Sequence, residues 1–252
     1  MKHPASRFVL LLTATITPPP GVSMRADPAV RLEDYRRSLL FYLVLLGRQQ
    51  LSAIVFVDNS NSDLSVLVAE ARAAGLEHCC EFISFAGLDY PVEYGYGYGE
   101  FKLLDYGMRH AAAVRGANVV VVKVTGRYIL HNLAGLLRRL PEHYDVVCDV
   151  RNRRRPWADM RVMVWTPAGY EAVLRGIYAR LRDDLTGYPP EMSMSQHLLG
   201  MSGSNAIVDR LPAEPFLSGF RGYDGKNWAR GSLLAKLCAR VVLRRLLFWY
   251  PV

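Results

Sequence analysis

Several polar segments of the sequence could bind a ligand, and one of them, K-V-T-G-R-Y, carries two cations. In this segment Lys123, Thr125 and Arg127 follow a run of four valines. Lys and Arg donate hydrogen bonds to phosphate oxygens, and the planar guanidinium group does so through two nitrogens at once. The Thr125 hydroxyl and the Gly126 amide add neutral donors. The segment predicts a phosphate-binding strand end; the alternative is a pair of cations that are solvated or paired with acidic neighbours.

A second polar segment, V-D-N-S-N-S-D, contains Asp58, Asn59 and Ser60. A carboxylate at the end of a strand can accept hydrogen bonds from a base or a ribose, and the Asn/Ser run turns the chain. The same residues also form Asx-turns and helix caps without any ligand. Both interpretations stay open at this point.

The third segment, Y-G-Y-G-Y-G-E, contains Gly97, Gly99 and Glu100. A dinucleotide fingerprint would need glycine at the position of Glu100, so the segment is not one. Glycines in front of a helix still allow a ligand to approach the backbone, and a helix N-terminus attracts phosphate. Glu100 suits the helix dipole and could bind a sugar hydroxyl. The alternative is a flexible aromatic loop.

Strands and helices alternate four times along the first half of the chain, which predicts an α/β fold. A mostly parallel central sheet with helices on both faces satisfies this order. Such sheets bind ligands at the carboxyl ends of their strands, where Thr15 and Thr17 also fall. The expected strands are residues 8–15, 53–57, 80–85 and 119–124, and the expected helices are 28–47, 64–74 and about 100–115.

The second half has a looser pattern and shows neither an internal repeat nor a linker. Its expected elements are a helix at 133–140, strands at 145–150 and 161–166, and helices at 167–181 and 188–199. We therefore expect a single domain of residues 1–252. It comprises a regular first half (about 1–130), a less regular second half (about 131–227) and a basic amphipathic helix (about 228–252).

Composition narrows the class of protein. The 252 residues include 51% hydrophobic and 21% charged residues, which is typical of a globular chain. The net charge of +8 suits a nucleotide, a nucleic acid or an acidic lipid surface. Four cysteines without C-x-x-C spacing make a disulfide framework or a zinc site improbable, so a reducing cytosol is expected. The N-terminal apolar run is short and favours a core strand over a signal peptide.

The order of the segments resembles that of GT-A type glycosyltransferases, over roughly residues 7–130. In the large inverting family of this fold a strand ends in an acidic turn like V-D-D-G-S-T-D, which V-D-N-S-N-S-D echoes. The segment G-Y-G-E-F-K-L-L-D-Y-G-M (97–108) corresponds to the helix that follows, and V-V-V-V-K-V-T-G-R-Y to the strand that ends in the acidic D-x-D motif. A K-x-T-G-R-Y segment is also similar to that of bacterial polysaccharide-assembly transferases. The resemblance implies sugar transfer from a nucleotide-sugar donor to a glycan. It also implies that residues 1–130, approximately, are the nucleotide-sugar-binding half and residues 131–227 the acceptor-side half.

The chain departs from the family at D-x-D itself. In metal-dependent members the two carboxylates hold a divalent ion that neutralises the diphosphate leaving group. Lys123 and Arg127 cannot ligate a cation, but they can place positive charge on phosphate oxygens directly. We therefore expect no metal and no cofactor, with Lys123 and Arg127 stabilising the leaving group.

Inverting transfer requires a base for the acceptor hydroxyl, which in the resembled fold often begins a helix. Glu191 in Y-P-P-E-M-S-M-S-Q-H-L-L fits this position, although it could simply complete a helix N-terminus. Asp149 and Asp159 are rival candidates because each lies near a strand end, and His197 is a weaker one. A retaining mechanism becomes plausible if no base is essential.

Two further basic segments bear on partners. The loop R-N-R-R-R (151–155) could contact donor phosphate, an anionic acceptor or lipid headgroups, or be solvated. The tail 228–252 intersperses five cations with Leu, Val, Phe, Trp and Tyr. It either lies on an anionic membrane or packs on the protein's own core. We expect a cytoplasmic protein, peripheral on the inner face of the membrane if the tail binds lipid.

The first hypothesis for function is a glycosyltransferase that extends a lipid-linked bacterial glycan. Its partners would be a nucleotide-sugar and a glycan acceptor, with no nucleic acid. The alternative from another class is a nucleic-acid-binding protein that uses the basic patches, although no recognised module is present. A nicotinamide-dependent oxidoreductase ranks third because the fingerprint is missing.

Overall fold

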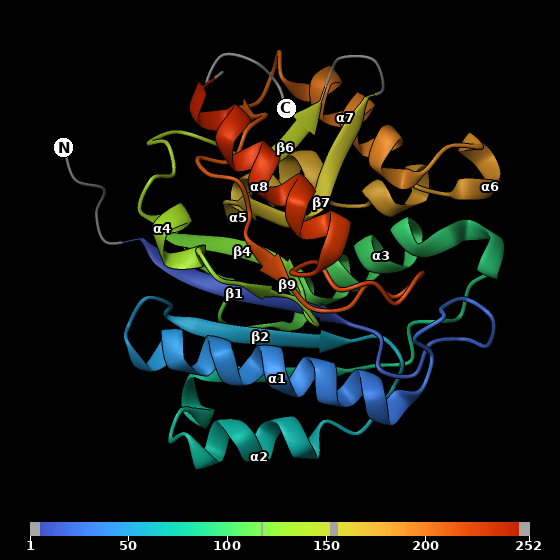
Figure 1. Cartoon of the computed structure of the whole chain (residues 1–252), viewed down its shortest axis with the longest axis vertical. Helices are drawn as coiled ribbons and strands as arrows, with labels where there is room; N and C mark the ends of the chain where they lie inside the picture. The colour runs from blue at the N-terminus through green and yellow to red at the C-terminus, as the bar shows by residue number, and fades with distance from the viewer. Residues whose placement is uncertain (1–5, 117, 152–155, 247–252) are drawn as a thin grey trace.

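The computed structural model describes residues 6–116, 118–151 and 156–246, and it centres on one seven-stranded sheet (Figure 1). The strand order is β3-β2-β1-β4-β7-β6-β8. The first four of these strands run parallel to one another, β7 is antiparallel to β4 and β6, and β8 is parallel to β6. The expected α/β fold with a mostly parallel central sheet is confirmed.

The strands of the main sheet are β1 (Arg7–Ala14), β2 (Ala53–Asp58), β3 (Cys80–Ser84), β4 (Val119–Thr125), β6 (Val146–Arg151), β7 (Trp157–Trp165) and β8 (Ile207–Val208). A separate two-stranded sheet pairs β5 (Ile129–Leu130) with β9 (Leu217–Ser218). This small sheet pairs the residues just after β4 with a segment nearly ninety residues later in the chain. The candidate site lies beside that later segment.

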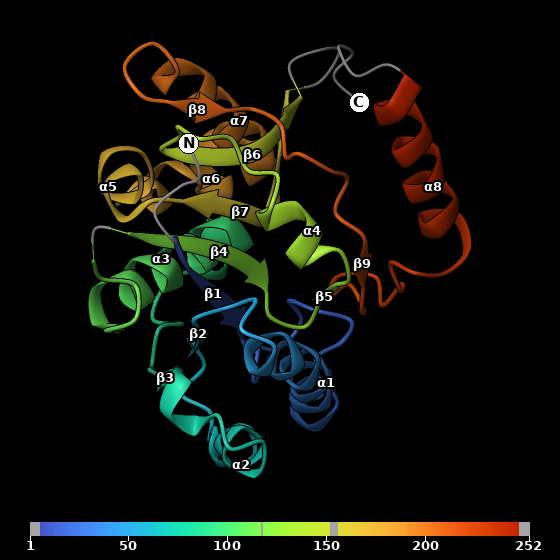
Figure 2. The same ribbon diagram turned by 90° about the vertical axis from the view of Figure 1, so that its left-hand side faces the viewer.

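The α-helices are α1 (Pro28–Gly47), α2 (Ser65–Ala73), α3 (Gly95–His110), α4 (Leu133–Leu137), α5 (Pro167–Gly169), α6 (Asp183–Thr186), α7 (Pro190–Met201) and α8 (Gly231–Leu246). Figures 1 and 2 show α1 on one face of the sheet and α3 and α7 on the other. Helix α8 lies to one side of the body in Figure 2, at the end of a long connecting segment.

Helix α1 shows how local signals set an element. The Asp27 carboxylate accepts a hydrogen bond from the Val30 amide at 3.0 Å, and Pro28 occupies the first helical position. A buried stripe then recurs at helical spacing and continues to the end of the helix at Gly47. Its apolar members are Tyr35, Leu39, Tyr42, Leu43 and Leu46.

The valine run of β4 is explained by burial on both faces of the sheet. Val120, Val122 and Val124 pack in the core layer that contains α1, whereas Val119 and Val121 pack in the layer on the α3 side. A strand covered on both faces has no polar side, so its sequence is continuously apolar. Lys123 interrupts this run on the α3 side.

Two expected elements differ from the structure. The Tyr/Gly segment was expected to precede a helix at residue 100, but α3 begins at Gly95, so these glycines lie inside its first turns. The single helix expected at 167–181 is broken into α5, a π-helical turn (Tyr170–Leu174) and a 3-10 turn (Ile177–Arg180). Gly176, at φ +71°, separates the last two pieces in a left-handed conformation that glycine adopts without strain.

Candidate functional site

The carboxyl ends of β1, β2 and β4 meet at one edge of the sheet, as their sequence order predicts. Two backbone hydrogen bonds join the segments that follow them: Gly126 donates to the Thr13 carbonyl at 2.8 Å, and Asn59 donates to the Ala14 carbonyl at 3.1 Å. Two of the polar segments singled out in the sequence therefore share this edge. The third forms the first turns of α3 and reaches the edge through Glu100, which accepts a hydrogen bond from the Thr13 hydroxyl at 3.1 Å.

Asp58 organises the turn between β1 and β2. It is fully buried, and its carboxylate accepts hydrogen bonds from three amides: Ile16 (2.8 Å), Ser60 (2.9 Å) and Ser62 (3.1 Å). The Ser60 hydroxyl adds a further bond at 2.8 Å. This is the Asx-turn alternative of the sequence analysis, realised in full. A contact of Asp58 with a base or a ribose stays a prediction, and it would need one of these bonds to be exchanged.

The residues around Asp58 hold the segment after β1 in place. The Thr15 hydroxyl donates to the Asn59 side chain at 2.7 Å, and the Thr17 amide donates to the Ser60 hydroxyl at 2.9 Å. Thr17 and Ser62 also share a bond between their hydroxyls at 3.0 Å. The structure thus brings together Thr15, Thr17, Asn59 and Ser60, which the sequence placed forty residues apart.

Lys123 lies within β4 rather than beyond its end, and its side chain has no exposed surface. Its Nζ atom forms an ion pair with Oε1 of Glu100 at 2.6 Å and donates to the carbonyl of Met160. The same Glu100 oxygen accepts from Thr13 at 3.1 Å and from Thr125 at 3.4 Å. The acidic-neighbour alternative therefore describes Lys123 in this structure. A direct contact with phosphate stays a prediction that requires this pair to open.

Arg127 follows β4 and faces the opposite side of the sheet. Its Nε donates to the Phe220 carbonyl at 3.0 Å, and its guanidinium lies 5.0 Å from the centre of the Tyr128 ring. Burial lowers the pKa of Arg127, but the neighbouring Tyr128 and Tyr35 raise the pKa by a larger amount, so the group stays charged. No carboxylate among the described residues forms an ion pair with Arg127. The structure thus separates the two cations that the sequence analysis used together.

Gly97 and Gly99 serve packing within the protein. A Cβ atom on Gly97 would lie 2.2 Å from Cβ of Pro190, and one on Gly99 would lie 1.9 Å from the Tyr90 hydroxyl. Both glycines are buried in α3. The close approach that they allow here is that of α7 and of Tyr90 to the helix, and their role in binding a ligand stays a prediction.

Glu191 begins α7 and approaches Glu100 from the other side of this edge. The Tyr96 hydroxyl donates to Oε2 of Glu191 at 2.7 Å. Burial raises the pKa of Glu191; the Tyr96 hydrogen bond opposes this rise, while Glu100 and Asp159 add to it. A carboxylate with a raised pKa is a stronger base, which suits proton abstraction near neutral pH.

The rival carboxylates are held by arginines. Asp149 pairs with Arg244 of α8 and accepts from the Leu211 amide at 2.7 Å, and burial raises the pKa of Asp149 to about 6. Burial would raise the pKa of Asp159 too, but the adjacent Arg161 lowers it to about 2. Nε2 of His197 donates to the Val173 carbonyl at 2.7 Å, in a structural position. A catalytic role for Asp149 stays a prediction.

The structure adds Arg25 and Arg31 to the edge, and the sequence analysis missed both. Arg31 is only 4% exposed, and its Nε donates to the Thr15 carbonyl at 2.7 Å. The sequence could have predicted that Arg31 is buried, because it occupies the same helical stripe as Tyr35 and Tyr42, where an apolar residue is expected. Arg25 precedes the helix in an irregular segment and carried no comparable signal.

Helix α8 is tied to the body by ion pairs. Arg244 contacts Glu214 at 2.8 Å as well as Asp149, and Arg240 contacts Glu214 at 3.4 Å. Val242, Leu243 and Leu246 remain at least 40% exposed. Within the described part of the chain, no helix has the length and hydrophobicity needed to cross a membrane. Residues 152–155 of the basic loop and 247–252 of the tail lie outside the described residues.

The donor set at the D-x-D position does not fit a divalent cation. Of Lys123, Thr125 and Arg127, only the threonine hydroxyl could ligate one. The nearest carboxylate, Glu100, is paired with Lys123. Among the described residues there is no cluster of three His, Cys, Asp or Glu side chains suited to a metal. No step of the chemistry below is therefore assigned to a metal.

Comparisons with known proteins give similarities of fold only. No protein-family model and no curated protein sequence matches the chain. Similar solved structures include a mannosyltransferase from Pyrobaculum calidifontis in complex with GDP-Man and Mn2+, at 13% identity and a TM-score of 0.49. That match covers 82% of this chain but only 55% of the mannosyltransferase.

Two further matches have comparable values. The galactosyltransferase LgtC, in complex with donor and acceptor sugar analogs, is 8% identical with a TM-score of 0.48, over 79% of this chain and 72% of its own. The bifunctional glycosyltransferase WbbM is 10% identical with a TM-score of 0.46, over 81% of this chain and 38% of its own. At these values a similarity assigns no activity. Glycosyltransferases are thus among the solved structures that this chain resembles in fold.

Proposed function

We propose that the protein is a glycosyltransferase that moves a sugar from a nucleotide-sugar donor to a glycan acceptor, without a metal ion and with inversion. One observation carries the proposal. Arg127, a half-buried cation that forms no ion pair among the described residues, follows β4, and Glu191, a carboxylate whose pKa is raised by burial, begins α7. A cation for a leaving phosphate and a base for an attacking hydroxyl are the two charges that inverting transfer needs.

In this mechanism the donor diphosphate would accept hydrogen bonds from Arg127. The guanidinium suits two phosphate oxygens and supplies the positive charge that a metal supplies elsewhere. As the bond between the sugar and the phosphate breaks, the negative charge that develops on the leaving group is stabilised by this fixed cation. The Thr125 hydroxyl and Gly126 amide are further donors on the same segment.

Glu191 would take the proton of the acceptor hydroxyl as that oxygen attacks the anomeric carbon. Tyr96 orients its carboxylate through the 2.7 Å hydrogen bond. Lys123 would have a different role from Arg127 before the donor binds. Its ion pair with Glu100 would hold the first turns of α3 against β4. We keep Asp149 as the second candidate base; its use would require release from Arg244.

The acceptor proposed here is a growing bacterial glycan, lipid-linked and presented at the cytoplasmic face of the membrane. The exposed apolar residues of α8, with the exposed cation Lys236 on the same helix, support peripheral contact with anionic lipid. Arg240 and Arg244 are committed to Glu214 and Asp149, so they contribute less charge to such a contact than the sequence suggests.

A panel of nucleotide-sugars tests the proposal. Each donor is incubated with the full chain, and the release of free nucleotide is measured with and without lipid-linked and soluble glycan acceptors. We expect one donor to be consumed above background and Glu191→Gln to lower turnover at least 100-fold, because a missing general base costs about that factor. Absence of nucleotide release or binding across the panel would contradict an enzyme of this class.

A further inference from the structure

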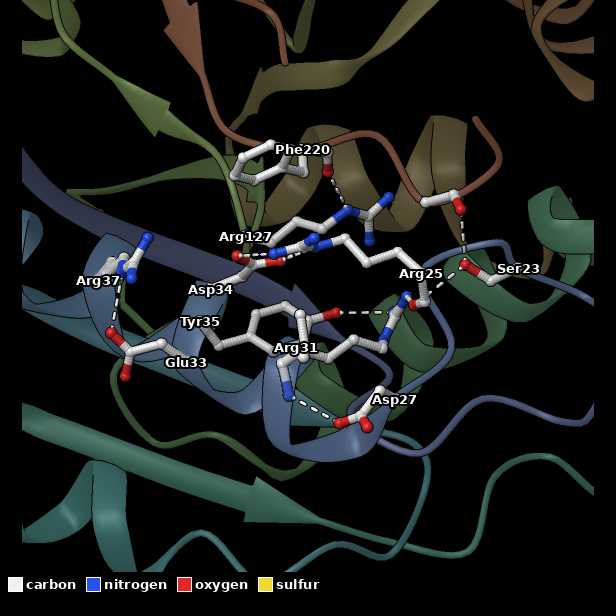
Figure 3. Close-up of polar contacts among 12 residues, drawn as sticks. Ser23, Arg25, Asp27, Arg31, Glu33, Asp34, Tyr35, Arg37, Arg127 and Phe220 are labelled. Carbon is white, nitrogen blue, oxygen red and sulfur yellow. Dashed lines mark hydrogen bonds and ion pairs between the residues drawn. The ribbon is translucent and has the colours of Figure 1, made fainter. Parts of the chain in front are cut away.

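Three arginines gather where α1 begins, and their charges are not balanced locally. Arg25 and Arg127 lie between α1 and the segment that carries Phe220, and Arg31 extends from the first turn of α1 beside Tyr35 (Figure 3). Asp34 is the carboxylate of this group, and it pairs with Arg25. Arg31 and Arg127 form no ion pair among the residues that the structure describes. The cluster therefore carries a net charge of about +2 by this simple count.

The other acidic groups near this cluster are committed elsewhere. Asp27 caps the first turn of α1 by accepting from the Val30 amide. Glu33 pairs with Arg36 and Arg37 at 2.8 Å each. Figure 3 shows the pair with Arg37, which points away from Arg31 and Arg127. Neither carboxylate is available to neutralise Arg31 or Arg127.

The two unbalanced guanidinium groups are held only by neutral oxygens. Arg31 donates to the Thr15 carbonyl (2.7 Å), the Arg25 carbonyl (3.1 Å) and the Tyr35 hydroxyl (3.2 Å). Arg127 donates to the Phe220 carbonyl at 3.0 Å. Arg31 is buried, and a buried charge without a counter-charge lowers the stability of the fold. Such a cost is typically found where function requires it.

The segment that includes Phe220 and Gly222 closes one side of the cluster. The Phe220 ring lies 4.2 Å from the Arg25 guanidinium, and the Gly222 carbonyl accepts from the Arg25 amide at 3.2 Å and from the Ser23 hydroxyl at 2.7 Å. A Cβ atom on Gly222 would come within 3.3 Å of Arg127 Nη2. The arginines are thus fixed in orientation from two directions before any ligand binds.

We propose that Arg25, Arg31 and Arg127 form a binding site for a diphosphate, with Arg25 and Arg127 in contact with its oxygens and Arg31 as a positioning residue behind them. The Arg25 side chain is 22% exposed and Arg127 is partly exposed, whereas Arg31 is buried. A diphosphate carries the charge that the cluster lacks. Its identification with the diphosphate of a nucleotide-sugar donor rests on the proposed function; the anion site itself does not.

Titration with inorganic pyrophosphate tests the site. Isothermal titration calorimetry at constant ionic strength compares the wild type with Arg127→Gln, Arg31→Gln and the control Arg37→Gln. Arg37 lies on the same helix and is 62% exposed. We expect at least tenfold weaker binding for the first two variants and a change below twofold for the control. Equal affinities in all four proteins, or no binding to the wild type, would overturn the proposal.

Thermal unfolding keeps the test decisive if a variant folds poorly. Pyrophosphate at 100 times its Kd should raise the Tm of the wild type, because a ligand of the native state adds about 2.7 kcal/mol at that concentration. Arg127→Lys, which keeps the charge but loses the planar fork, should fold and retain part of this shift. An undiminished shift in Arg127→Gln, Arg31→Gln and Arg127→Lys together would refute the site.

Competition separates the sources of the phosphate. UDP and GDP should displace pyrophosphate, whereas uridine and guanosine should not; vesicles of phosphatidylglycerol should also fail to displace it. Displacement by vesicles and not by nucleotides would overturn the assignment to a donor diphosphate.

A chain that binds pyrophosphate through these arginines but consumes no nucleotide-sugar would refute the proposed function alone. Turnover that is unchanged in Arg31→Gln and Arg127→Gln would refute the site alone.

Discussion

The Nζ atom of Lys123 lies 2.6 Å from Oε1 of Glu100, and the lysine is completely buried. This pair joins the centre of β4 to the first turns of α3, beneath the hydroxyls of Thr13 and Thr125. The D-x-D position of the resembled fold is therefore occupied by an internal ion pair on one face and by Arg127 on the other. Positive charge reaches the edge of the sheet through the arginine.

Removing Lys123 should destabilise the fold. In Lys123→Met the Glu100 carboxylate remains, 80% buried, without its counter-charge, and we expect a loss of about 3 kcal/mol in the free energy of unfolding. Urea denaturation measures this change. Lys102→Met, which breaks a pair with the exposed Asp89, should cost less than about 1 kcal/mol. Similar values for the two variants would contradict a structural role of the Lys123–Glu100 pair.

Tyr96→Phe should shift the pH profile of turnover. The Tyr96 hydrogen bond lowers the pKa of Glu191 against the effect of burial, so its loss raises that pKa. A base acts only when it is deprotonated, and activity therefore falls as the pH drops through its pKa. The acidic limb of kcat should move to higher pH in Tyr96→Phe and stay in place in Tyr188→Phe, whose tyrosine is 54% exposed. An unmoved limb would argue against Glu191 as the base.

Gly97→Ala should disturb the junction of α3 and α7. The new Cβ atom would meet Pro190 at 2.2 Å, and Pro190 precedes Glu191 directly. We expect a loss of about 1–3 kcal/mol in stability from overpacking, with reduced activity. Gly200→Ala on α7 meets nothing within 4 Å, and it should instead gain about 0.5–1 kcal/mol from helix propensity. Opposite signs in denaturant unfolding are the expected result; a stable, active Gly97→Ala protein would refute the packing argument.

Arg244→Gln should loosen α8 without unfolding the body. This substitution removes the ion pairs to Asp149 and Glu214, while the apolar residues of α8 are already largely exposed. Hydrogen exchange should show faster exchange of the α8 amides and unchanged protection in β1 and β4. Lys236→Gln on the exposed part of the same helix should leave α8 protection as it is. Unchanged exchange in Arg244→Gln would contradict a role of the two Arg244 ion pairs in holding the helix.

Elements with strong local signals were predictable from the sequence. The cap at Asp27, the proline after it and the buried stripe set α1 at the residues expected, and the valine run set β4 to within one residue. The start of α3 was not predictable in this way, since glycine is a poor helix former. Here the packing of Gly97 against Pro190 and of Gly99 against Tyr90 overrides that propensity.

The candidate site was predictable in its place but only partly in its contacts. The strand order puts the segments after β1, β2 and β4 on one edge, as parallel topology requires. Whether Lys123 faces α1 or α3 could not be inferred, because both faces of β4 are buried and the alternation of polar residues is missing. The Arg25–Arg31–Arg127 cluster joins residues about a hundred positions apart, so no local pattern reveals it.

In the proposed mechanism a protein cation, and no metal, stabilises the leaving phosphate. The most direct test measures nucleotide release from the accepted donor in the presence of excess chelator, with the wild type and Arg127→Gln side by side. We expect wild-type turnover to be unchanged by the chelator and by added Mn2+, and Arg127→Gln to be at least 100-fold slower. Wild-type turnover that is abolished by the chelator and restored by Mn2+ would contradict the account.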